Sequence, residues 1–175
     1  MEVKQKRYTF AEKKKKTRKI MNEKIQINVY KGLPMVLDKI KAVALAAVLG
    51  KSGFWLHGKM KHSNVRGFVQ EFKESDLELV NNGLQVLGDE ISQCMVKYSE
   101  DREGVIEQIK VLSNYINMPY IYNKVMGKER QWYNTRMLAR VPGRKVCVFK
   151  EDDILKINMA AMQIANELRS IEFTL

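Results

Sequence analysis

Apolar residues recur at helical spacing along much of the chain and predict a mainly α-helical fold. Within residues 105–115 they fall at positions 105, 106, 109 and 112, which is the spacing of a helix with one buried face. Pro119 suits the first turn of a short helix that runs to Met126, because that turn does not need the missing N–H group. Gly127 can adopt the left-handed conformation that ends a helix. We expect another helix over residues 129–139.

The C-terminal residues predict a turn, a short strand and a long helix. Residues 141–144 read Val-Pro-Gly-Arg, which is turn chemistry, and residues 145–149 are short and β-branched enough for a strand or wing. The carboxylates at positions 151–153 suit the positive end of a helix dipole. Apolar residues at 154, 157, 161, 164 and 168 continue this helix along one face.

The chain contains an internal duplication. Residues 48–92 align without a gap on residues 125–169, at an offset of 77, with twelve identities in 45 positions. The identical pairs include Trp55 with Trp132, Asn81 with Asn158, and the two Phe-Lys-Glu-x-Asp strings. Self-similarity of this kind predicts two copies of one structural module.

The first copy is expected to follow the plan of the second. Gly32-Leu-Pro34 would open its first helix, residues 42–49 would form its short helix, and Gly50 would make its turn. The next helix would contain Trp55, and the closing helix would run from about Glu74 towards Ile91. The repeated Trp, Met and Phe positions of the two copies are expected to pack in the core.

The polar segment 99–104 is the natural boundary between the copies. We therefore predict a basic arm (1–25), a first helical module (26–98), a linker (99–104) and a second helical module (105–175). Each module is expected to carry a short β wing or hairpin.

The formal net charge of the protein is +11, and residues 1–25 carry ten Lys or Arg against three Glu. Because residues 1–25 carry most of this net charge, the basicity belongs to the arm, and the two modules are close to neutral. Such an arm attracts polyanions and is favoured by counterion release on phosphates. A solubilising tail, a nuclear-import signal and an acidic membrane contact are the alternatives. The candidate phosphate-binding residues of the arm are Lys13, Lys14, Lys15, Lys16, Arg18 and Lys19.

Around each turn glycine, the sequence resembles the helix-turn-helix of phage-repressor-like DNA-binding proteins. The resemblance rests on Val48-Leu-Gly-Lys-x-x-x-Trp55-Leu56-x-x-x-Met60 and on Val125-Met-Gly-Lys-x-x-x-Trp132-Tyr133-x-x-x-Met137. It implies that the second helix of each pair lies in the major groove of double-stranded DNA. The implied base-reading residues are Arg130, Gln131, Asn134 and Arg136 in the second copy, and Ser52, His57, Lys59 and Lys61 in the first. Lys51 and Lys128 would hold phosphates, and an ordinary solvated surface is the alternative for the whole set.

The sequence offers little for catalysis, a cofactor or a metal. Gly50-Lys51-Ser52 lacks the earlier glycine of a phosphate-binding loop, because position 45 is Leu. His57 and His62 are five residues apart and do not share a helix face, and Cys94 and Cys147 have no second ligand nearby in sequence. We expect no enzyme, no cofactor and no metal site.

The chain is also expected to be soluble and not secreted. Its longest apolar run, 42–49, is far shorter than the roughly 20 residues of a membrane span. A cytoplasmic, nucleoid-associated protein or a virion protein would fit, with no membrane partner.

Two functions follow from these observations. The first is a DNA-binding regulator of transcription or replication, of phage or mobile-element type, with two tethered modules and a basic arm. The second is a structural, interaction or virion-packaged protein that reuses the helical module as a scaffold. In that case the arm would bind nucleic acid without sequence preference or dock on an acidic protein partner, and self-association stays open in both cases.

Overall fold

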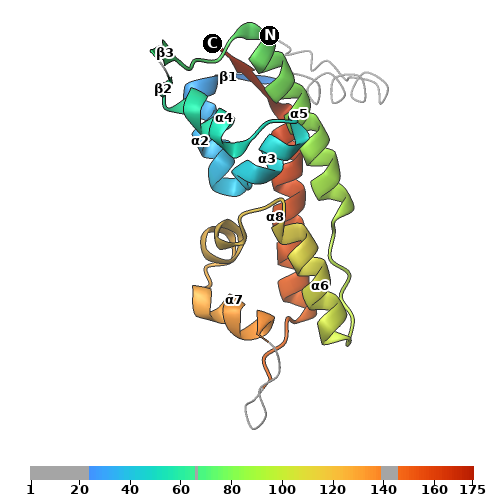
Figure 1. Cartoon of the computed structure of the whole chain (residues 1–175). Helices are drawn as coiled ribbons and strands as arrows, with labels where there is room; N and C mark the ends of the chain where they lie inside the picture. The colour runs from blue at the N-terminus through green and yellow to red at the C-terminus, as the bar shows by residue number, and fades with distance from the viewer. Residues whose placement is uncertain (1–23, 66, 139–145) are drawn as a thin grey trace, which may run out of the picture.

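The computed structural model describes residues 24–65, 67–138 and 146–175, and this part of the chain is mainly helical, as predicted (Figure 1). Two two-stranded sheets accompany the helices in the described residues. In chain order the elements are β1 (Ile25–Asn28), α2 (Val29–Lys39), α3 (Ala42–Val48), α4 (Gly53–Met60), β2 (Asn64–Val65), β3 (Phe68–Val69), α5 (Glu74–Gln93), α6 (Arg102–Ser113), the π-helix η1 (Tyr120–Val125), α7 (Arg130–Met137), α8 (Glu151–Ser170) and β4 (Ile171–Thr174).

The helices recur at the offset of the sequence repeat. Helices α4 and α7 begin and end 77 residues apart, and so do the long closing helices α5 and α8. Gly50 and Gly127 both have a φ of 62°, the left-handed conformation that glycine adopts at low cost. The equivalent segments therefore share their turns as well as their helices.

The two copies are joined by reciprocal contacts. Asn81 on α5 accepts a hydrogen bond from Phe173 N (2.7 Å) and donates to Phe173 O (3.1 Å). Asn158 on α8, the equivalent residue, binds Val96 N (2.9 Å) and Val96 O (2.8 Å) in the same way. Because Val96 and Phe173 are also 77 residues apart, each copy holds the other by the same contact. The copies are thus related by an approximate two-fold axis.

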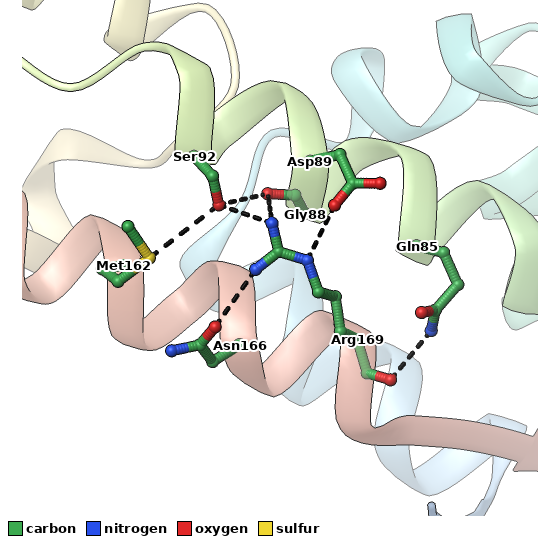
Figure 2. Close-up of polar contacts among 7 residues, drawn as sticks. All are labelled: Gln85, Gly88, Asp89, Ser92, Met162, Asn166 and Arg169. Atoms are coloured by element: carbon green, nitrogen blue, oxygen red, sulfur yellow. Dashed lines mark hydrogen bonds and ion pairs between the residues drawn. The ribbon is translucent and has the colours of Figure 1, made fainter. Parts of the chain in front are cut away.

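The long helices α5 and α8 run antiparallel where they pack against each other (Figure 2). Gly88 allows the close approach, since a Cβ there would lie 2.9 Å from the backbone oxygen of Ala165, its equivalent residue. The Arg169 guanidinium donates to Asp89 Oδ1 (2.8 Å), to Gly88 O (2.9 Å) and to Ser92 Oγ (2.6 Å). Charge-assisted hydrogen bonds of this kind fix the register of the two helices.

A second junction lies where α2 and α6 end. Ile40 and Ile116 form an antiparallel bridge. The Asn117 amide donates to the carbonyl oxygens of Leu37, Asp38 and Ile40, at 2.9 to 3.1 Å. These bonds satisfy carbonyls that the end of a helix leaves without partners.

The buried apolar residues form one cluster that draws on both copies, including Leu33, Leu84, Ile109 and Ile157. Neither copy therefore closes a core by itself. The short helices α3 and η1 pack against the long closing helices α5 and α8, respectively.

Several boundaries differ from the expectation. Helix α2 begins at Val29 and not at Gly32-Leu-Pro34, because the Asn28 side chain caps it and accepts a hydrogen bond from Tyr30 N. Helix α6 begins at Arg102, inside the predicted linker 99–104. Residues 146–149 form no strand.

The sequence pattern also missed β1 and β4, which pair in parallel with Ile25 opposite Ile171. The turn predicted at 141–144 and the arm residues 1–23 lie outside the described residues.

Candidate nucleic-acid interface

Each copy places a short helix, a four-residue connection and a second helix in series. In the first copy α3 ends at Val48, Gly50 turns the chain, and Ser52 caps α4 by accepting a hydrogen bond from Trp55 N (3.2 Å). In the second copy η1 leads through Gly127 to α7, with Lys128 N donating to Tyr122 O (2.6 Å). The position of Ser52 as a helix cap differs from the base-reading role that the resemblance implied.

The second helix of each pair is anchored by four side chains at equivalent positions, which are a tryptophan, a phenylalanine, a cation and an aspartate. Trp55 packs edge to face on Phe72, with ring centroids 6.1 Å apart, and the ammonium group of Lys59 lies over the Trp55 ring. Lys59 also pairs with Asp76 at 2.8 Å. In the second copy Trp132 packs on Phe149 at 5.6 Å, Arg136 lies over Trp132, and Arg136 faces Asp153 at 3.9 Å.

This anchor corrects two of the predicted base-reading residues. The side chains of Lys59 and Arg136 are only 12% and 16% exposed. Both cations are turned inwards because a tryptophan face and a carboxylate hold them. The expectation that they project into solvent is therefore wrong.

The carboxylates of this anchor also begin the closing helices. Asp76 Oδ2 accepts a hydrogen bond from Lys73 N (2.9 Å), and Asp153 Oδ2 accepts one from Lys150 N (3.0 Å). Burial by itself would raise the pKa of Asp76, but the hydrogen bonds from Lys59 and from the Lys73 backbone, with the charges of these lysines, hold it below its ordinary value of 3.8. The Asp76 carboxylate is therefore charged at neutral pH.

Helix α7 is tied down further by a residue of the predicted linker. Arg102 is buried, with 9% of its surface exposed, and its guanidinium donates to the carbonyl oxygens of Arg136 (3.1 Å) and Leu138. These are carbonyls at the C-terminal end of α7, where a cation also suits the helix dipole. Tyr133 stacks on Tyr122 at 5.1 Å, and burial raises the pKa of its hydroxyl to about 12.

The outward residues of α7 are Arg130, Gln131 and Asn134, all exposed. They lie at positions i, i+1 and i+4 of the helix and so share a face. In the first copy His57 on α4 and Lys61, which directly follows α4, are exposed. The most exposed apolar residue there is Phe54, at 91%.

Basic charge concentrates in the segments that contain α4 and α7, although the net charge of each whole module is close to zero. Residues 39–70 contain six Lys or Arg and no Asp or Glu, and residues 116–147 contain seven against one. The acidic residues of each module lie mostly outside these segments, for example in 71–115, and cancel the charge in the sum. Counting charge in windows of about 30 residues would have found the pattern. The exposed cations described in these segments are Lys51, Lys61, Lys124, Lys128 and Arg130.

The candidate phosphate-binding residues fall into two groups. Lys51 and Lys128 are exposed at equivalent positions after the turn glycines, and the ammonium group of Lys51 lies 5.8 Å from the Trp55 ring centroid. The candidates in the arm, Lys13–Lys16 with Arg18 and Lys19, lie outside the described residues.

A β-hairpin follows α4 in the position of a wing. Asn64 Oδ1 accepts a hydrogen bond from Gly67 N (2.9 Å), which closes the turn between β2 and β3. Phe68 at its tip is 78% exposed.

Figure 1 shows α4 and α7 on the same side of α8, towards its two ends. The two-fold relation of the copies thus gives the protein two similar basic segments.

Comparison of the chain with protein-family models, with curated proteins and with solved structures returns no match. The likeness to phage-repressor-like proteins therefore stays a prediction from the sequence. Within residues 24–65, 67–138 and 146–175, no three His, Cys, Asp or Glu side chains are grouped so that they could hold a metal ion. None of the described helices combines the length and the apolar character needed to cross a membrane.

Proposed function

We propose that this chain is a non-enzymatic protein that binds double-stranded DNA, with α4 and α7 in two successive major grooves. The observation that carries the proposal is the pair of basic helix, turn and helix segments related by an approximate two-fold axis. Dimeric helix-turn-helix proteins use such an axis to reach two half-sites about one helical turn apart. Here one chain would supply both reading helices.

The exposed residues divide the work between affinity and selectivity. Lys51, Lys128 and the lysines of the arm are suited to phosphates, which position a protein on DNA without reading its sequence. Arg130, Gln131 and Asn134 are suited to bases, since Arg can donate two hydrogen bonds to guanine and Asn or Gln can pair with adenine. A small regulator of transcription or replication, of phage or mobile-element type, is the role that fits.

A structural or interaction role is the second candidate, and exposed apolar residues on α8 favour it. Leu155 and Met159 are 56% and 65% exposed. The equivalent residues on α5 are Glu78 and Asn82, which are polar. A protein contact on α8 would explain this difference, and it would predict nucleic-acid binding without sequence preference.

The test is selection from a randomised duplex pool by the full chain, with sequencing of the retained DNA. We expect a motif with two half-sites. The double variant Arg130→Ala with Asn134→Ala should flatten one half-site, at about 1 to 3 kcal/mol for each lost base contact, and should leave the salt dependence nearly unchanged.

The matched variant replaces Lys13, Lys14, Lys15 and Lys16 by Gln. It should keep the motif and lower the slope of log affinity against log salt by about 3 to 4, because each phosphate contact contributes about 0.9. Retention of duplexes without any enriched motif would refute sequence reading and favour the second candidate.

A further inference from the structure

Phe54 is exposed, and the packing of α4 on the core does not depend on it. It is the second residue of α4, and 91% of its surface is exposed. The next two residues, Trp55 and Leu56, already supply the contacts of α4 with the core. A partner that covers Phe54 would gain the free energy of removing this apolar surface from water.

The duplicated module provides an internal comparison for this position. Gln131 occupies the equivalent place on α7, and Asn134 is equivalent to His57. Helices α4 and α7 have equivalent bounds and equivalent anchoring side chains, so the fold accepts either Phe or Gln at this position. Gln131 can make hydrogen bonds, whereas Phe54 offers only an apolar surface.

The charge around Phe54 indicates what covers it. Lys51, His57 and Lys61 are exposed in the same segment, and no carboxylate occurs anywhere in residues 39–70. The partner is therefore a polyanion that also presents an apolar group. In the major groove of DNA that group is the 5-methyl of thymine, and the N-terminal residues of a reading helix are the ones that reach base edges.

We propose that Phe54 contacts a thymine methyl group in the half-site bound by α4, so that the protein recognises two unequal half-sites. The α7 half-site is read by hydrogen bonds from Arg130, Gln131 and Asn134. The α4 half-site is read by apolar contact from Phe54. This inference rests on the proposed function and specifies what its target contains.

The test uses the duplex selected by the full chain. The half-site that relaxes in Arg130→Ala with Asn134→Ala belongs to α7, and the other belongs to α4. Each thymine of the α4 half-site is then replaced by deoxyuridine, which removes only the methyl group. At one of these positions the replacement should weaken binding by wild type about fourfold, which is the effect expected from the loss of one buried methyl group.

Phe54→Ala should bind the thymine duplex at least about fourfold more weakly than wild type. Its affinity should not change when thymine is replaced by deoxyuridine. Gln131→Ala should keep the response to deoxyuridine in the α4 half-site. Met159→Ala, which removes an exposed apolar side chain from α8, should behave as wild type. Circular dichroism and urea unfolding of each variant check that the fold is retained.

An equal response of Phe54→Ala and wild type to deoxyuridine would overturn the inference and leave the proposed function standing. The inference would also be overturned if Phe54→Ala altered only the sedimentation of the free protein, because Phe54 would then contact a protein. If no motif is enriched at all, the proposed function fails, and the inference fails with it.

Discussion

Asp76 and Asp153 each join two elements through one carboxylate. Each accepts a backbone hydrogen bond at the start of a closing helix and faces the cation that lies over the repeated tryptophan. The sequence pattern placed Asp153 at the start of a helix, and Asp76 occupies the equivalent position of the first copy. Their second role could not be seen, because Lys59 and Arg136 looked like solvent-facing cations until the positions of Trp55 and Trp132 were known.

Replacing Asp76 by Asn should destabilise the protein by about 1 to 2 kcal/mol at pH 7, since the amide oxygen can still accept the Lys73 hydrogen bond but the negative charge that pairs with Lys59 is lost. The pKa of Asp76 is lowered in the folded state, so its contribution is present above the unfolded pKa and is lost as pH falls through the folded pKa. The difference between wild type and Asp76→Asn should therefore shrink below about pH 4.

Urea unfolding at pH 7 and at pH 3 measures this difference. Glu78→Gln is the control, because Glu78 is exposed on the same helix and its replacement should change little at either pH. An equal cost of Asp76→Asn at both pH values would contradict the assigned ion pair.

The turn glycine is a second feature of single residues. Gly50 has a φ of 62°, and a Cβ there would meet nothing within 4 Å. Gly50→Ala should therefore cost about 1 to 2 kcal/mol through backbone conformation alone. Gly53 also has open space around it but lies in helix α4 without a positive φ. Gly53→Ala should be neutral or stabilising by up to about 1 kcal/mol. Thermal unfolding compares the two, and a common sign would contradict the left-handed turn.

The elements are arranged by the α5–α8 crossing more than by any sheet. Helical spacing predicted the long closing helices, and the structure places their starts at Glu74 and Glu151. Periodicity says which face of a helix is buried but not which helix covers it. The reciprocal contacts of Asn81 and Asn158 with the opposite copy could therefore not be predicted from the sequence, although the two residues are an identical polar pair in the repeat.

Gly88→Ala should weaken this crossing. The new Cβ would lie 2.9 Å from the backbone oxygen of Ala165, so the helices must move apart, at a cost of about 1 to 3 kcal/mol. Val86→Ala on the exposed side of α5 is the control and should have a small effect. Chemical denaturation gives the free energies, and equal stability of Gly88→Ala and wild type would contradict the close crossing.

The whole molecule presents two basic segments around one shared core. Its net charge of +11 had been assigned mainly to the arm, yet residues 39–70 and 116–147 each carry an excess of six positive charges. Under the proposed function, one chain should be enough for each duplex.

This arrangement predicts a fixed spacing between the half-sites. Inserting about five base pairs between them turns one half-site to the opposite side of the duplex, because a helical turn takes about 10 base pairs. Affinity should then fall to the level of a single half-site, and an insertion of about ten should not restore it, since the shared core holds α4 and α7 at one separation. Titration with sedimentation analysis should give one chain per duplex. Unchanged affinity after the five-base-pair insertion would argue against simultaneous use of both helices.

The sequence by itself determined the helices and their repetition. Helical periodicity, turn glycines and self-similarity are local properties, so they located α4, α5, α7 and α8 within a few residues of their bounds. Only the tertiary structure decided what the copies share. The pairing of Ile25 with Ile171, the inward position of Arg136 and the exposure of Phe54 all depend on neighbours from distant parts of the chain. A single-chain pattern of polar and apolar residues carries no information on which distant segment provides those neighbours.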